Sequence, residues 1–225
     1  MRARTWTLAL LSVCIGCQSA PVRLPLAEPT ASAGPSPLAT SPAGTPTQEA
    51  APTAERRGAG HVAGDRIFSI DAHLGVPILD RAIFWDGNAE KDNFGLGVNN
   101  YWFLSDWFAL RATLNANVFK VPGRDTLAGE IEAGGRFYVW DFDTWSVFWD
   151  QTGGFEYAND QVPPGGTYWN FTFSFGPGAD IPIGDDAHLM LGMRFHHMSN
   201  ALGRTSARNP SQNEGRFYIE YGWNW

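Results

Sequence analysis

A histidine and a serine near the end of the chain have the residue types and the spacing of an esterase pair. His197 and Ser199 are separated by one residue in the segment FHHMSN, residues 195–200. On a β-strand, this spacing puts both side chains on one face with Cα atoms about 6.6 Å apart, so the imidazole can lean onto the hydroxyl. Such a pair supports attack by serine with histidine as the base. The pattern has low specificity, and polar residues at a membrane boundary are the alternative interpretation, because catalysis also needs an orienting acceptor and oxyanion donors.

The element that carries this pair is one of a series of predicted strands. From residue 66 onward, apolar and polar residues alternate with a period of two, and helical spacing is absent. In the segment 107–119, for example, Leu110 and Leu114 alternate with Arg111 and Asn115. The predicted strands are 66–76, 93–104, 107–119, 127–140, 145–157, 167–181, 187–200 and 213–225.

The two faces of these strands predict an all-β fold, an eight-stranded antiparallel transmembrane β-barrel of the bacterial outer membrane. Each strand is long enough for a tilted crossing and has one apolar face and one polar face. A soluble barrel, the alternative, would turn its large aromatic residues inward. The end of the chain, FYIEYGWNW, resembles the assembly signal of outer-membrane barrels. Alternation places these charged residues in the lumen, where we expect ion pairs rather than an open pore: Asp71, Glu130, Glu132, Arg136, Arg194, Arg216 and Glu220.

The lengths of the predicted connections indicate which way the barrel faces. Three connections are short, 105–106, 141–144 and 184–186, and short turns are typical of the periplasmic side. Four are longer: 77–92, 120–126, 158–166 and 201–212. The long connections, and with them His197 and Ser199, are therefore expected at the cell exterior.

The residues before the barrel predict an export signal and a linker. Residues 1–17 have two arginines followed by an apolar stretch too short to span a bilayer, as in an export signal. Cys17 is a candidate for lipoprotein acylation, with ordinary cleavage around Ser19 or Ala20 as the alternative. Residues 18–62 are rich in Pro, Ala, Thr and Gly and predict a disordered linker, so the barrel domain is assigned to 63–225.

Composition restricts the partners. The chain has a formal net charge of −7, and the part from Gly64 onward is more acidic still, which argues against nucleic acid. Both cysteines lie in the signal region, so disulfides, thiolate chemistry and sulfur-ligated metals are not expected in the barrel. His196 and His197 point to opposite faces and cannot chelate one ion. No cofactor and no metal are predicted, while outer-membrane lipid is the expected surrounding and a homodimer is compatible with the sequence.

The segment FHHMSNALGRTSARNPSQNEGRFYIEYGW, residues 195–223, resembles the C-terminal signature of the PagL family of outer-membrane lipid A 3-O-deacylases. His197, Ser199 and Asn200 match a His-x-Ser-Asn motif, and Asn209-Pro210 matches the turn that follows it. The resemblance implies a serine carboxylic-ester hydrolase on the outer wall of the barrel. Its substrate would be the ester-linked 3-hydroxyacyl chain at position 3 of lipid A in lipopolysaccharide.

The sequence departs from this family at the orienting acid. Matching the turn puts Asn213 where the family has a carboxylate, and Glu214 follows one residue later. Alternation predicts that Asn213 faces lipid, in step with Phe217, and that it accepts a hydrogen bond from His197. Glu214 is the alternative orienting acid if a bulge turns it outward.

The loop beside the motif supplies the remaining expected roles. Asn209 and nearby backbone amides would hold the oxyanion. Arg204 and Arg208 would attract the sugar phosphates, with Asn200 also on the substrate, whereas solvated loop charges are the alternative reading of the two arginines. A non-enzymatic outer-membrane barrel with an adhesion or envelope-structural role is the competing function.

Overall fold

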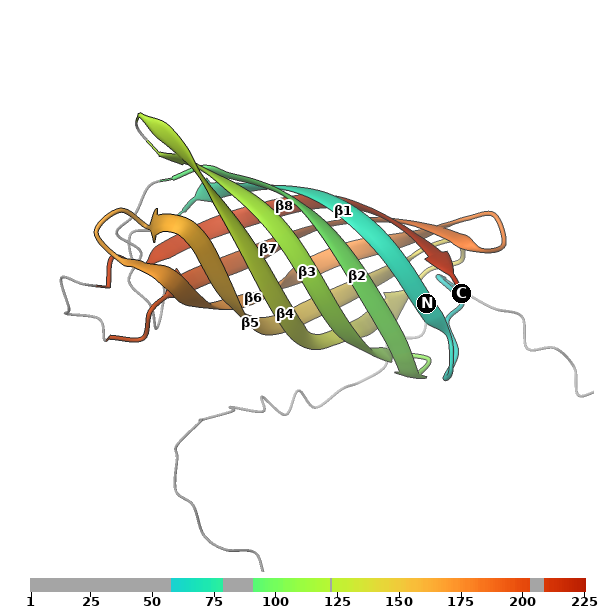
Figure 1. The fold of residues 1–225 in the computed structure, drawn as a ribbon. Coiled ribbons are helices and arrows are strands. Elements are labelled where there is room, and N and C mark those ends of the chain that lie inside the picture. Colours follow the sequence, from blue (N-terminus) through green and yellow to red (C-terminus); the bar gives the residue numbers. More distant parts are fainter. Residues whose placement is uncertain (1–57, 79–90, 122, 203–208) are drawn as a thin grey trace, which may run out of the picture. The chain divides into compact units, whose positions relative to one another are not determined.

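The fold is a closed antiparallel barrel of eight strands in sequence order, in which β8 pairs with β1 (Figure 1). The computed structural model describes residues 58–78, 91–121, 123–202 and 209–225. Within this part of the chain, no helix is long and apolar enough to cross a membrane. The strands are β1 (Arg66–Pro77), β2 (Asn93–Ser105), β3 (Phe108–Val121), β4 (Arg124–Asp141), β5 (Ser146–Val162), β6 (Thr167–Ile183), β7 (Ala187–Ser199) and β8 (Gln212–Asn224). The predicted fold class is confirmed.

The outer and inner walls of the barrel follow the two-residue alternation. On β3 the side chain of Leu114 is 58% exposed, whereas that of the next residue, Asn115, is 4% exposed. The same contrast recurs around the barrel, where Leu96, Ile131 and many aromatic residues point outward. Large apolar side chains outside and polar ones inside suit a wall that faces lipid, as the sequence predicted.

The lumen is a packed core of paired charges. Asp150 on β5 accepts bonds from Arg136 at 2.8 and 3.0 Å and pairs with Arg194 at 2.9 Å and with Arg111 at 3.5 Å. Arg136 also lies 3.4 Å from Glu220. All the charged residues assigned to the lumen by alternation are buried. A buried charge without a partner costs several kcal/mol, so this network makes a polar lumen compatible with a stable barrel.

The two ends of the barrel differ in their connections. At one end, hereafter the short-turn end, the chain turns at 106–107, 142–145 and 184–186, close to the predicted positions. At the opposite end two connections are long, 78–92 and 200–211. Strand β1 begins at the short-turn end, and β8 ends there.

Two connections at the opposite end are shorter than the sequence suggested. Strands β3 and β4 continue to the pair Val121 and Arg124, and β5 and β6 continue to the pair Val162 and Thr167. The long loops predicted at 120–126 and 158–166 were therefore wrong. Polar residues there resemble a loop, but cross-strand contacts such as the 2.7 Å ion pair of Lys120 and Asp125 extend the β3–β4 hairpin, which projects from this end of the barrel (Figure 1).

The chain approaches β1 along the short-turn end. Residues 1–57, with the predicted export signal and most of the predicted linker, lie outside the described residues. The last linker positions, 58–62, are described, and Ala59 and His61 are buried there. The Ala59 N–H donates to the Ser146 hydroxyl at 2.8 Å, which fastens this segment to β5.

Candidate active site

The predicted pair lies where β7 finishes, at the end of the barrel opposite the short turns. His197 is paired with Phe173 on β6 and with Asn213 on β8, and Ser199 is paired with Phe171. Phe171 is an exposed residue of the outer wall. Cross-strand partners share a face, so the pair and Asn213 lie on the outer wall, at the limit of its apolar surface.

The hydrogen bond predicted between His197 and Asn213 is present. His197 Nδ1 lies 2.7 Å from Asn213 Oδ1. An amide oxygen only accepts hydrogen bonds, so Nδ1 carries the proton and the neutral imidazole presents an unprotonated Nε2. His197 is 5% exposed and Asn213 is 1% exposed, whereas Ser199 is half-buried. Surrounding residues thus cover His197 and Asn213 and leave Ser199 more accessible.

Ser199 and His197 lie on one face of β7, two residues apart. The two residues are adjacent on the outer wall, with Asn213 directly across from the histidine. The structure therefore brings Ser199, His197 and Asn213 together on one face.

Glu214 is turned away from His197 into the lumen. The register of β7 and β8 is continuous from Met198 and Gln212 onward, with no bulge that would turn Glu214 outward. Its carboxylate accepts a bond from Arg216 at 3.0 Å and pairs with His196 at 2.9 Å. The structure therefore places the amide, and not the acid, beside His197.

The end of β7 is held against the returning loop by two asparagines. The Asn200 N–H donates to Asn209 Oδ1 at 3.0 Å, and Asn200 Oδ1 accepts from the Leu202 N–H at 3.2 Å. Between them Ala201 has a φ of 59°, a left-handed conformation that is uncommon for a residue other than glycine. Such backbone strain tends to gather at functional sites. Asn200 and Asn209 are thus brought next to Ser199.

The other predicted substrate ligands cannot be placed in the same way. Arg204 and Arg208 fall in 203–208, outside the described residues. Cys17, the candidate acylation site, lies in 1–57, which is also outside them. Their assigned roles remain predictions.

Two other groups of side chains in the described residues come close enough to hold a metal ion, and neither includes His197. One consists of His61, Asp180 and His188, and the other of Glu130, Glu132 and His196. The first group was not predicted from the sequence, because His61 was assigned to the linker. The composition of the sequence could have indicated this group, because the Pro-, Ala- and Thr-rich stretch gives way to the segment GAGHVAGD at residues 58–65, before β1 begins.

Comparisons with known proteins agree with the fold. No family model matches the sequence, and no curated protein sequence matches it either. The crystal structure of the outer membrane enzyme PagL aligns with a TM-score of 0.52 at 15% identity, covering 68% of this chain and 97% of that one. The outer membrane protein OprG from Pseudomonas aeruginosa aligns with a TM-score of 0.47 at 13% identity, covering 75% of this chain and 99% of that one. At such identities the likeness shows the fold alone, which is that of an eight-stranded outer-membrane β-barrel.

Proposed function

We propose that this barrel is a lipid A 3-O-deacylase, a serine esterase that works on the outer face of its own wall. The observation that carries the proposal is the 2.7 Å bond of His197 to Asn213 beside Ser199 on this face. Moving a polar group from water toward hydrocarbon costs free energy unless the group is hydrogen-bonded. A purely structural wall therefore gains no stability from placing these residues there. An esterase that cleaves a membrane lipid, by contrast, can use a serine and an oriented histidine on the face that meets the lipid.

The reaction begins with Ser199 as nucleophile. Its oxygen attacks the carbonyl carbon of the ester-linked 3-hydroxyacyl chain while its proton moves to His197 Nε2. The tetrahedral intermediate collapses, the sugar oxygen leaves with the proton from His197, and the acyl group stays on the serine. Water then attacks the acyl-enzyme with His197 as base, which releases the fatty acid and restores the hydroxyl. Asn213 holds the imidazole in the required tautomer and orientation throughout.

The loop beside Ser199 completes the proposed site. Asn209, fixed through its side-chain oxygen by the Asn200 amide, would direct its NH₂ group toward the oxyanion. Arg204 and Arg208, in the same loop, would pair with the phosphates of the lipid A sugars. Lipid A stays in the outer leaflet, so groups on the outer wall can reach its ester, whereas groups in the lumen would require the lipid to leave the membrane.

The fold likeness to PagL and the match of His197, Ser199 and Asn200 to that family's motif support the same assignment. The competing function, a non-enzymatic barrel with an adhesive or structural role, is favoured by a different observation. The ion pairs of the lumen, such as those of Asp150 with Arg136 and Arg194, do not involve the outer-wall pair, so the barrel does not need a catalytic site to be stable.

Mass spectrometry of lipid A separates these two functions. The full chain is expressed in a Gram-negative host without its own 3-O-deacylase, and Ser199→Ala at the same level is the control. We expect lipid A to lose one ester-linked 3-hydroxyacyl group with the parent chain only. Unchanged lipid A, with the barrel folded in the outer membrane, contradicts the deacylase.

A further inference from the structure

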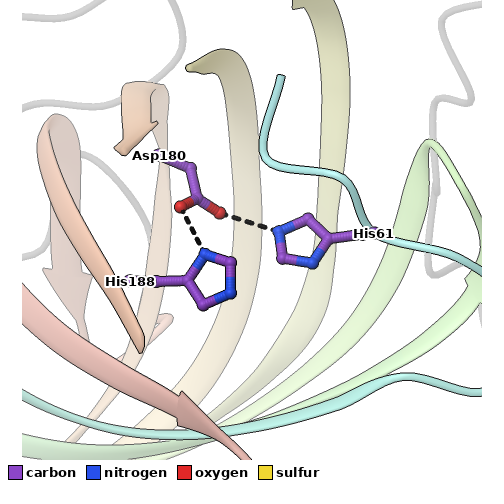
Figure 2. Close-up of side chains that lie close together, drawn as sticks. All are labelled: His61, Asp180 and His188. Carbon is purple, nitrogen blue, oxygen red and sulfur yellow. Dashed lines mark hydrogen bonds and ion pairs between the residues drawn. The ribbon is translucent and has the colours of Figure 1, made fainter. Parts of the chain in front are cut away.

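Three side chains from distant parts of the sequence converge at the short-turn end of the barrel (Figure 2). His61 precedes β1, Asp180 is on β6 and His188 is on β7. One oxygen of Asp180 lies 2.9 Å from His61 Nε2, and the other lies 2.9 Å from His188 Nδ1. The two imidazole rings are stacked, with centroids 4.8 Å apart. A single carboxylate therefore faces a nitrogen from each of two histidines.

We propose that His61, Asp180 and His188 bind a divalent transition-metal ion of the zinc class. One ligand atom from each residue lies within 4.8 Å of the other two. Two imidazoles and one carboxylate are a common ligand set for zinc, with water in the fourth position. Ligands about 2.0 Å from a tetrahedral ion are about 3.3 Å apart, so ligand atoms that lie within 4.8 Å of one another would have to close by about 1.5 Å at most.

The surroundings hold these ligands as an outer shell of a metal site does. The Tyr138 hydroxyl donates to Asp180 at 2.7 Å, and the His61 ring stacks on Phe103 with centroids 4.1 Å apart. Contacts of this kind fix the orientation of a ligating carboxylate or imidazole.

An adjoining pocket gives an ion and its water ligand a way in. It has a volume of about 380 Å³, and His61 and His188 form part of its lining. Asp65 and Asp185 also line it and add negative charge on the path to the cluster. The histidines are buried but reachable from this pocket.

The second group of histidine and acids shows why the first is the better metal site. Beside Glu130 and His196, Arg216 places its guanidinium 3.0 Å from the carboxylate and 3.3 Å from the imidazole. A positive charge therefore already occupies that position. Among the described residues, the close charged-type partners of Asp180 are the rings of His61 and His188 and not an arginine or lysine, so a divalent cation would not compete with a fixed positive charge there.

A metal ion in this position would join the approach segment to the barrel wall. His61 belongs to the segment that Gly58 and Gly60, with φ of 64° and 70°, bend into the short-turn end. Asp180 and His188 flank the β6–β7 turn. Metal binding would thus stabilise the docking of this segment, because binding free energy adds to that of the folded arrangement.

Titration of the purified chain tests the site. Full-length protein without a polyhistidine tag is folded in detergent and titrated with Zn²⁺ by calorimetry and with Co²⁺ by visible absorption. We expect one ion per chain and the intense bands of tetrahedral Co²⁺, which Zn²⁺ displaces. His61→Ala and Asp180→Asn should each weaken Zn²⁺ binding by about 100-fold or more, since even outer-shell changes cost about 10–100-fold.

The matched control is His73→Ala, which removes another buried lumenal histidine, bonded to Asp71 at 2.8 Å. It should bind Zn²⁺ as the parent chain does. His61 lies outside the strands, so its variant is expected to keep the barrel, which circular dichroism checks. Absence of binding to the folded parent, or equal binding in His61→Ala, overturns the proposal. Neither readout depends on deacylation.

Discussion

His196 and His197 are neighbours in sequence but belong to two different regions of the molecule. Each has a cross-strand partner on β8: Glu214 for His196 and Asn213 for His197. In the lumen, His196 lies between two carboxylates, Glu130 at 3.0 Å and Glu214 at 2.9 Å. On the outer wall, His197 is bonded to an amide. The strand pair β7–β8 therefore carries one histidine with carboxylate partners inside the barrel and one histidine with an amide partner outside.

The difference follows from what each face can tolerate. Inside, Arg216 pairs with Glu130 and Glu214 at 3.0 Å each, so the charges are mutually satisfied. Outside, the neutral Asn213 orients His197 without placing a charge on the apolar face. We expect the inner group of residues to contribute to stability, and the outer one is where the proposed reaction takes place. Substitutions on the two faces should therefore have separate effects.

The largest expected effect comes from the proposed nucleophile and base. Ser199→Ala and His197→Ala should each reduce deacylation by about 1,000-fold or more, because removal of either group eliminates the attack step. Neither should lower the thermal stability of the barrel much, since both side chains lie outside the lumenal network. Lipid A mass spectrometry and thermal unfolding of the same preparations measure the two quantities. Full deacylation by either variant would remove the assigned role.

Glu214→Ala tests the inner half of the comparison. It leaves Arg216 and His196 without one of their carboxylates, and breaking a buried pair costs about 3–5 kcal/mol. Urea unfolding should show this loss, while the folded fraction retains deacylation. A selective loss of activity at unchanged stability would instead show that Glu214 serves the outer histidine.

Asn213→Ala is the matched change on the outer wall, one residue away. We expect deacylation to fall by about 10–100-fold, because His197 loses the acceptor that fixes its tautomer. The free energy of unfolding should change by about 1 kcal/mol, the contribution of one neutral hydrogen bond. Activity equal to that of the parent chain would contradict the orienting role of Asn213.

Alternation alone was enough to predict which residues share a face, but not what each end of the barrel contains. The period of two placed Asn213 outside and Glu214 inside, and the structure has both there. The period says nothing about polar residues that pair across a hairpin, so the extension of β3 and β4 to Val121 and Arg124 was missed. His61 was missed for a similar reason, since a single buried residue outside the strands has no periodicity.

The smallest expected effect is also the most specific, and it concerns the residue at which the chain departs from the PagL family motif. In a serine protease, an asparagine at the orienting position costs about 10,000-fold because it selects the wrong tautomer. Here Asn213 Oδ1 faces His197 Nδ1 at 2.7 Å, so the tautomer is already right and only the stabilisation of the imidazolium is missing. Asn213→Asp supplies that charge, and deacylation should rise by about 10-fold while stability falls, because the new carboxylate is buried beside lipid. Kinetics on purified lipid A and urea unfolding check both changes, with Glu214→Gln as the control on the opposite face. If activity falls instead, deacylation requires a neutral residue at position 213. The missing carboxylate charge would then not be a defect of this site.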